Sequence, residues 1–113
     1  MPYINTVVNV PIPEKTEKEL AAAYGKAIEI IKGKTENWLM LNFAENSHMY
    51  FAGSNSPTAM VEIMVFGSAP ESEYEELTAE VCSLINEKLG IPKTRIYVKY
   101  GEYDKWGWNS CNF

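Results

Sequence analysis

The sequence predicts an α/β protein, an α+β sandwich in which two tandem βαβ units form a four-stranded sheet with two helices on one face. Each half of the chain runs from a β-branched apolar stretch through an amphipathic segment to a second apolar stretch. The 113 residues, 46% of them hydrophobic, suit one domain that buries roughly two-thirds of its unfolded surface. Landmarks of the two halves also pair at a constant offset: Pro13 with Pro70, Leu20 with Leu77, Ile28 with Ile85, and Gly33 with Gly90.

The first half predicts strand, helix and strand in that order. Residues 6–10 are apolar and β-branched apart from Asn9, and two prolines then end the strand. In the following segment, Thr16 and Glu19 have the spacing of a capping box, apolar residues recur at helical spacing, and Gly33 is expected as the C-cap. Residues 37–43 are short and apolar, which predicts a strand covered on both faces.

The second half repeats this order. Residues 59–67 form a strand, Ser72 and Glu75 a second capping box, and Gly90 ends the helix, after which residues 94–100 are the closing strand. The segment between the halves is rich in turn formers, with a short extra strand expected at 49–51. The tail contains two tryptophans and a terminal phenylalanine, so it must pack on its own subunit or on a neighbour.

These elements predict a single domain over 1–113, with repeats at about 2–43 and 59–100 and an aromatic tail at 101–113. Two helices on one face leave the other face of the sheet as an apolar surface without cover inside one subunit. Self-association in a closed ring would cover it.

Charge and composition exclude several classes of partner. The net charge of −5 and the pI near 4.9 argue against nucleic acid, whose binding proteins usually carry a basic surface. No apolar run approaches the roughly 20 residues of a membrane span, and the start does not have the pattern of a signal peptide. We expect no membrane partner and a cytoplasmic protein, or one exported without a signal peptide.

Cysteine and histidine offer little for a metal site. Cys82 and Cys111 lie far apart, and His48 is the single histidine, so we expect no metal and no Ser/His pair. Cys82 is expected to be a buried structural thiol and His48 a polar turn residue.

Several segments together resemble the macrophage migration inhibitory factor family of tautomerases. They are Pro2 after the initiator Met, the tandem repeat, "GK" at 33–34, "FAGSNSP" at 51–57, "RIYVKY" at 95–100 and "GWN" at 107–109. The resemblance covers essentially the whole chain. It implies a homotrimer, an isomerase that needs no cofactor, and a small enolisable carbonyl substrate.

The resemblance gives Pro2 the role of general base. Removal of Met1 would leave a secondary amine at the chain start, and desolvation or a nearby cation lowers the pKa of such an amine below about 8. A neutral amine can then take a proton from the carbon next to a carbonyl. The alternative is that Pro2 only begins a strand, where proline is tolerated.

Lys34 matches the family's pocket lysine, which binds substrate carboxylate and depresses the pKa of the amine. The alternative is a cation that interacts with the end of the helix dipole, and its repeat partner Lys93 shows that this alternative has substance.

The other pocket positions also follow from the resemblance. Tyr97 matches a tyrosine contributed by the neighbouring subunit, and Phe66 stands where an isoleucine contacts substrate through its backbone. Lys99 replaces an asparagine that hydrogen-bonds ligands. The remaining aromatic positions, each of which could instead be simple packing, are Trp38, Trp106, Trp108 and Phe113.

A more aromatic pocket with two cations, Lys34 and Lys99, favours a flat anionic ligand such as an aryl α-keto acid. The redox CxxC of some family members is absent, since residues 58–61 read Thr-Ala-Met-Val. Dehalogenation or decarboxylation is poorly supported because such chemistry usually adds arginines, and Arg95 is the single one here. Two alternatives to an enzyme remain: a cytokine-like protein that binds a receptor, and a trimeric scaffold with a vestigial pocket.

Overall fold

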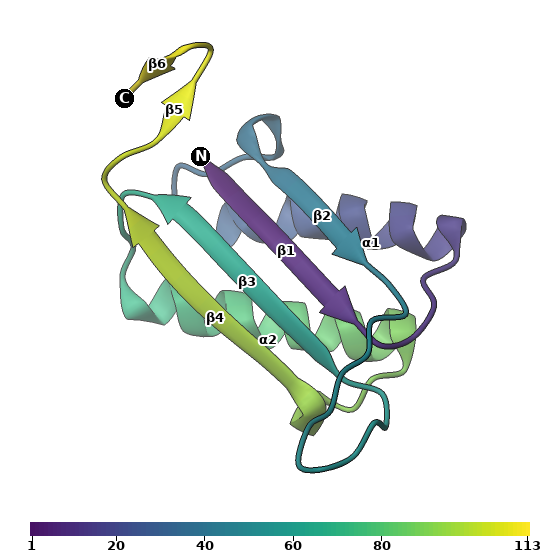
Figure 1. Ribbon diagram of the computed structural model, residues 1–113. Helices are drawn as coiled ribbons and strands as arrows, with labels where there is room; N and C mark the ends of the chain where they lie inside the picture. The colour runs from purple at the N-terminus through teal and green to yellow at the C-terminus, as the bar shows by residue number, and fades with distance from the viewer.

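The computed structural model describes all of residues 1–113 and contains the predicted double βαβ order (Figure 1). The first unit comprises β1 (Pro2–Val8), α1 (Glu14–Ala27) and β2 (Met40–Ala44). The second comprises β3 (Ala59–Phe66), α2 (Glu71–Leu89) and β4 (Ile96–Tyr103). The tail forms a small hairpin of β5 (Gly107–Trp108) and β6 (Cys111–Asn112).

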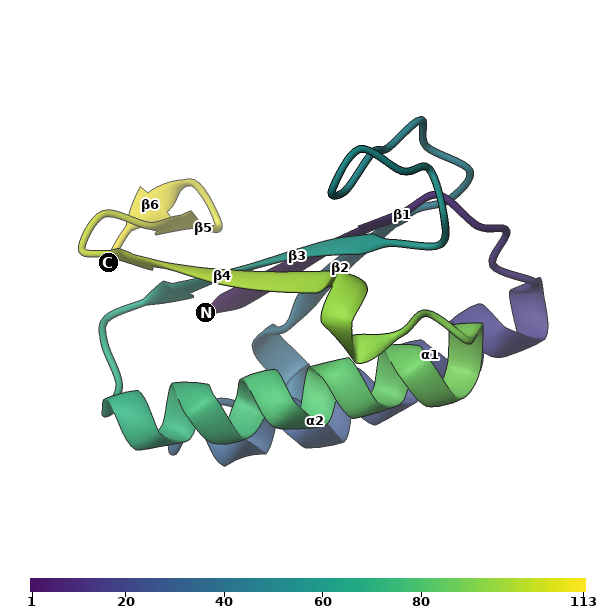
Figure 2. The ribbon, with the colours of Figure 1, turned by 90° about the horizontal axis from the view of Figure 1, so that it is seen from below.

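The four long strands form one mixed sheet in the order β2-β1-β3-β4. Each βαβ unit contributes a parallel pair, and the two units meet where β1 runs antiparallel to β3. Both helices lie on one face of the sheet, whereas the 45–58 loop and the tail hairpin rise on the other side (Figure 2). The predicted fold class is therefore confirmed.

The hydrophobic core lies between the sheet and the helices. Alternate residues of β1 and β3 are buried, as the two-residue period of a strand requires. Leu20 of α1 and Ile28 of the 3-10 turn that follows it contribute to the core from the first repeat, and their partners Leu77 and Ile85 of α2 from the second, all fully buried. One polar pair crosses this core: the Thr6 and Tyr24 hydroxyls lie 3.0 Å apart, and neither residue is exposed.

Removing one hydroxyl of the Thr6 and Tyr24 pair should lower the free energy of unfolding by more than the small change in side-chain size suggests. Thr6→Val keeps the shape but leaves the Tyr24 hydroxyl buried without this partner, so we expect unfolding to become easier by about 1–3 kcal/mol. Adding Tyr24→Phe should recover part of that loss, because both polar groups are then absent. Urea unfolding of the two single variants and the double variant measures this. Strictly additive costs would contradict the interpretation of the pair as mutually dependent.

Both helices begin earlier than the capping boxes predicted. They start at Glu14 and Glu71, directly after Pro13 and Pro70, and no side chain caps either start. Proline before the first turn fixes a backbone angle compatible with helix entry, so it sets the start in place of a hydroxyl cap. At the other end, Gly90 is the left-handed C-cap that was predicted, with φ of 70°.

The first helix ends before its predicted C-cap. It stops at Ala27 and continues as a 3-10 turn over Ile28–Ile30, and Gly33 lies beyond that turn with φ of 86°. Gly33 thus ends the connection rather than the α-helix itself.

The strands also shift relative to their predicted bounds. The first runs over Pro2–Val8 instead of 6–10, and the last over Ile96–Tyr103 instead of 94–100. The prediction that residues 37–43 are covered on both faces is wrong, because 36–38 form a 3-10 turn and β2 is an edge strand with Met40 exposed. The extra strand at 49–51 is reduced to a bridge between Phe51 and Ser54.

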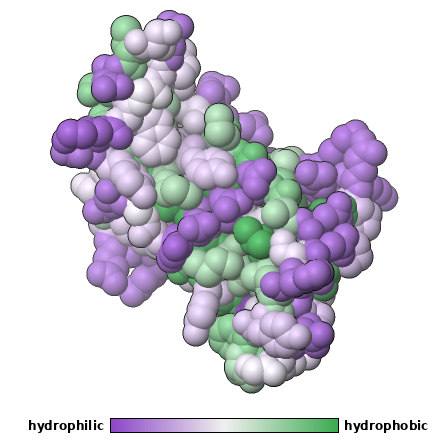
Figure 3. All heavy atoms as spheres, in the orientation of Figure 1, coloured by the Kyte–Doolittle hydropathy of each residue, from purple (hydrophilic) through white to green (hydrophobic).

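The open face of the sheet is not wholly apolar, which corrects the expectation of an uninterrupted apolar surface. Cross-strand register places Met40, Tyr3, Met64 and Gly101 in one row and Ala44, Val7, Met60 and Tyr97 in another. Between them lies a polar row of Asn42, Asn5, Glu62 and Lys99. Hydrophilic and hydrophobic side chains accordingly share this side of the molecule (Figure 3). A neighbouring subunit that covers this face must therefore also accommodate the charged Glu62 and Lys99 side chains.

Arg95 holds the 51–57 segment in shape. Its guanidinium donates to the carbonyl oxygens of Phe51, Ser54, Ser56 and Pro57 at 2.9–3.1 Å. It also lies 5.3 Å from the centroid of the Phe51 ring. The single arginine of the chain is thus a structural residue of its own subunit.

Arg95→Lys should loosen this segment, because an ammonium cannot present the planar set of donors that reaches these carbonyls. We expect a loss of about 1–3 kcal/mol in the free energy of unfolding and faster proteolysis within 51–57. Lys93→Met is the matched control, since Lys93 is an exposed cation two residues away. Equal protease sensitivity of the two variants would refute the role given to Arg95.

Cys82 is only half-buried rather than fully buried, although partial burial still raises the pKa of its thiol. Neither α1 nor α2 has the length and apolar character that a membrane-spanning helix needs.

Candidate functional site

A cavity of about 660 Å³ opens at the corner where the chain begins. Three segments line it: the start of β1 with Met1, Pro2 and Tyr3, residues 37–42 around the start of β2, and residues 106–108 of the tail. Pro2, Trp38, Trp106 and Trp108 were all predicted as site residues, and all four line this cavity. Segments far apart in the sequence thus meet around Pro2.

Lys34 is held beside the chain start by the backbone of Phe66. The Lys34 ammonium donates to the Phe66 carbonyl oxygen at 2.9 Å, and the Phe66 amide donates to the Met1 carbonyl at 3.0 Å. The positive φ of Gly33 turns the chain just before Lys34. One residue at the end of β3 therefore positions both the cation and the first peptide of the chain.

The environment of the amine at the chain start favours its neutral form. Burial, and second the nearby Lys34 ammonium, lower the pKa of the Met1 amine from its ordinary value of 8.0. Both causes disfavour a second positive charge at this corner. Pro2 itself is buried, one residue deeper than Met1.

Trp38 and Trp108, which line the cavity, belong to an aromatic cluster that also contains Phe113 and Phe66, two residues outside the cavity lining. The Trp38 and Trp108 rings meet edge to face with centroids 5.0 Å apart, and Trp108 stacks on Phe113 at 6.4 Å. Phe113 also contacts Phe66, at 5.5 Å. Positive φ at Asn109 and Ser110 makes the two-residue turn that folds the tail back on itself. The tail packs on its own subunit through these rings, yet Trp108 and Phe113 stay about half exposed.

Tyr97 and Lys99 do not reach this cavity within one subunit. Tyr97 aligns through Met60 with Val7, five residues along β1 from Pro2, which is a separation of roughly 17 Å at strand rise. Its ring packs on Phe51 at 4.9 Å and is largely exposed. Lys99 aligns with Asn5 on the open face. Any role of these two in catalysis requires a second subunit.

The sequence prediction did not include several residues near the site. Tyr3, Asn37 and Met40 line the cavity. Tyr3 and Met40 are register partners, which could have been found only by aligning β1 with β2. Glu62 was also missed, although it binds the predicted Lys99 at 3.1 Å.

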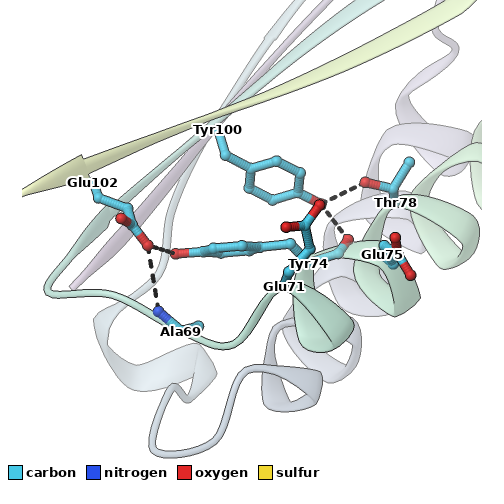
Figure 4. Close-up of a pocket in the computed structure, with 7 residues that line it drawn as sticks. All are labelled: Ala69, Glu71, Tyr74, Glu75, Thr78, Tyr100 and Glu102. Atoms are coloured by element: carbon cyan, nitrogen blue, oxygen red, sulfur yellow. Dashed lines mark hydrogen bonds between the residues drawn. The ribbon is translucent and has the colours of Figure 1, made fainter.

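A larger cavity of about 910 Å³ lies elsewhere, between α2 and the edge strand β4 (Figure 4). Its tyrosines are engaged internally: the Tyr74 hydroxyl donates to Glu102 at 2.7 Å, and Tyr100 bonds Thr78 and the Tyr74 carbonyl. Burial and the Glu102 bond raise the pKa of Tyr74 to about 12. The smaller cavity is the candidate site despite its size, because Pro2 and the three tryptophans expected at the site line it and none of the expected site residues lines the larger one.

The profile of the family described as macrophage migration inhibitory factor (MIF) matches residues 1–113. The chain belongs to the MIF family. Its similarity to a crystal structure of Leishmania major MIF2 covers 100% of this chain and 97% of that one, at 34% identity and a TM-score of 0.94.

Two further relatives of the MIF family match nearly all of this chain. The macrophage migration inhibitory factor of Meriones unguiculatus is 26% identical over 118 residues, covering 100% of this chain and 99% of its own. A crystal structure of the homologue from Prochlorococcus marinus is 30% identical, covers 98% of each chain and has a TM-score of 0.80. Full-length coverage shows that the MIF fold accounts for the whole chain, the aromatic tail included.

Proposed function

We propose that this protein is a cofactor-independent keto-enol tautomerase of the phenylpyruvate type. The observation that carries the proposal is the partly buried Met1 amine at the chain start, whose pKa is lowered by burial and by the Lys34 ammonium beside it. Removal of Met1 makes the pyrrolidine nitrogen of Pro2 the amine at the chain start, and this nitrogen then acts as the base.

The proposed reaction moves one proton and loses no atom. In the keto-to-enol direction, the neutral Pro2 amine takes a proton from the carbon next to the carbonyl and becomes an ammonium, and a solvent water gives a proton to the carbonyl oxygen as the enol forms. In the reverse direction, the Pro2 ammonium returns its proton to that carbon, and the enol hydroxyl loses its proton to water. The amine must therefore be neutral at the start of one direction and protonated at the start of the other.

Lys34 is proposed to bind the substrate carboxylate. An ammonium has three N–H donors, and the Phe66 carbonyl occupies one of them. The remaining donors can bind an anion beside the amine, and the Trp38 and Trp108 rings suit a flat aryl group. An aryl α-keto acid combines these features.

We further propose that the active form is a homotrimer in which Tyr97 completes the pocket of the neighbouring subunit. The 17 Å or so between Tyr97 and Pro2 in one chain, together with the exposure of the Tyr97 ring, supports this arrangement. Tyr97→Phe, which removes only the hydroxyl, should raise the KM for phenylpyruvate about tenfold.

Conversion of phenylpyruvate between its enol and keto forms, followed by ultraviolet absorbance, tests the proposed activity. The purified protein should accelerate the conversion well above the buffer rate, and a mass spectrum should show that Met1 is absent. A rate equal to that of buffer would refute the proposed activity.

A further inference from the structure

A continuous hydrogen-bonded row crosses the open face of the sheet. The Asn42 side-chain amide donates to Asn5 at 2.9 Å, and the Asn5 amide donates to Glu62 at 3.1 Å. From the other side, the Lys99 ammonium lies 3.1 Å from the second Glu62 oxygen. The row contains one residue from each of the four strands, at one register position.

Glu62 is the acceptor on which the row converges. Each of its carboxylate oxygens has one donor, the Asn5 amide on Oε1 and the Lys99 ammonium on Oε2. These bonds, with Lys99 as the largest cause, lower the pKa of the Glu62 carboxyl. The carboxylate is therefore ionised at neutral pH and offsets the charge of Lys99.

Lys99 and Tyr97 lie on the same face of β4, because they are two residues apart in one strand. An arrangement that brings Tyr97 to a neighbour's pocket therefore directs Lys99 toward the same side. A free ammonium there would be a second cation besides Lys34. Glu62 binds the Lys99 ammonium within the same sheet, so this ammonium does not act as a second cation for the ligand.

We infer that Glu62 is a specificity-determining residue. It binds the Lys99 ammonium and keeps it from binding a second substrate carboxylate, so that the pocket selects substrates with one carboxylate over substrates with two. The inference rests on the proposed tautomerase site shared between subunits. It replaces the expectation of two free cations with one free cation, Lys34, and one internally neutralised cation, Lys99.

Glu62→Gln tests this, because glutamine keeps the size and the acceptor for Asn5 but removes the charge that binds Lys99. The probes are phenylpyruvate, with one carboxylate, and 2-oxoglutarate, with two, and their Kd values are measured by calorimetry. We expect the preference for phenylpyruvate over 2-oxoglutarate to fall about fivefold, the ratio that corresponds to ~1 kcal/mol for an exposed ion pair.

Two further variants make the result specific. Adding Lys99→Met to Glu62→Gln should restore the original preference, because the released cation is then absent. Glu80→Gln removes the same charge from an exposed position of α2 and should leave the preference at its wild-type value.

An unchanged preference in Glu62→Gln, or a change that persists after Lys99→Met, would overturn the inference while leaving the tautomerase proposal intact. Failure of the wild type both to bind phenylpyruvate and to convert it would instead contradict the proposed function, and this inference with it.

Discussion

Replacing Pro2 with glycine should lower kcat/KM for phenylpyruvate by about 10²-fold, within the range of general acid-base catalysis. Glycine leaves a primary amine that rotates freely, whereas the pyrrolidine ring fixes its nitrogen at the start of β1. One alanine inserted between Met1 and Pro2 should have a larger effect, because it moves the amine away from Lys34. Steady-state kinetics of both variants measure these losses.

The same variants separate catalysis from receptor binding. A surface that binds a protein receptor should survive Pro2→Gly as long as the fold is kept, which circular dichroism and the oligomeric mass would verify. Wild-type kinetics in both variants would eliminate the amine as the base and favour the binding-protein or scaffold alternative.

Replacing Lys34 with methionine should raise the KM for phenylpyruvate about 10- to 100-fold, as expected for the loss of a charged hydrogen bond to the carboxylate. Methionine keeps most of the length of the side chain, so the loss reports on charge and donor capacity. Lys93→Met, at the repeat partner of Lys34, is the matched control and should keep the wild-type KM. Similar KM values for the two variants would mean that Lys34 serves only the helix end.

Lys34→Met should also shift the pH dependence of the rate. The lysine lowers the pKa of the chain-start amine, so its removal raises that pKa. A higher pKa leaves less neutral amine at a given pH. The acid limb of kcat/KM in the direction that needs a neutral base should therefore move to higher pH. An acid limb that stays in place would show that burial alone sets the pKa.

The repeat made the fold predictable from sequence because its apolar spacing is set by the core. Leu20 and Leu77, at the same position in two helices, are both fully buried, so the offset reports a real structural equivalence. Helix starts were less predictable, since the hydroxyls of Thr16 and Ser72 compete with Pro13 and Pro70, and the proline in each case sets the start. Burial of residues 37–43 was misjudged because an apolar edge strand and a central strand share one composition.

The site was predictable where it depends on sequence position and less so where it depends on register. Pro2, Trp38, Trp106 and Trp108, which the resemblance assigned to the site, line one cavity. Glu62 escaped notice because its partner Lys99 lies 37 positions later in the chain, and only the pairing of β3 with β4 brings them together. The consequence of Lys99 for ligand charge could therefore not be derived from its identity alone.

The central claim is that burial and the nearby Lys34 ammonium lower the pKa of the Pro2 amine, so that neutral amine is available as a base near neutral pH. An NMR titration of protein labelled with ¹⁵N-proline measures the pKa of that nitrogen directly. We expect a pKa clearly below about 8, the ordinary value for a chain-start amine, and an increase on Lys34→Met. A pKa at or above 8 in the wild type, or a Pro2 nitrogen still in a peptide bond to Met1, would contradict the account.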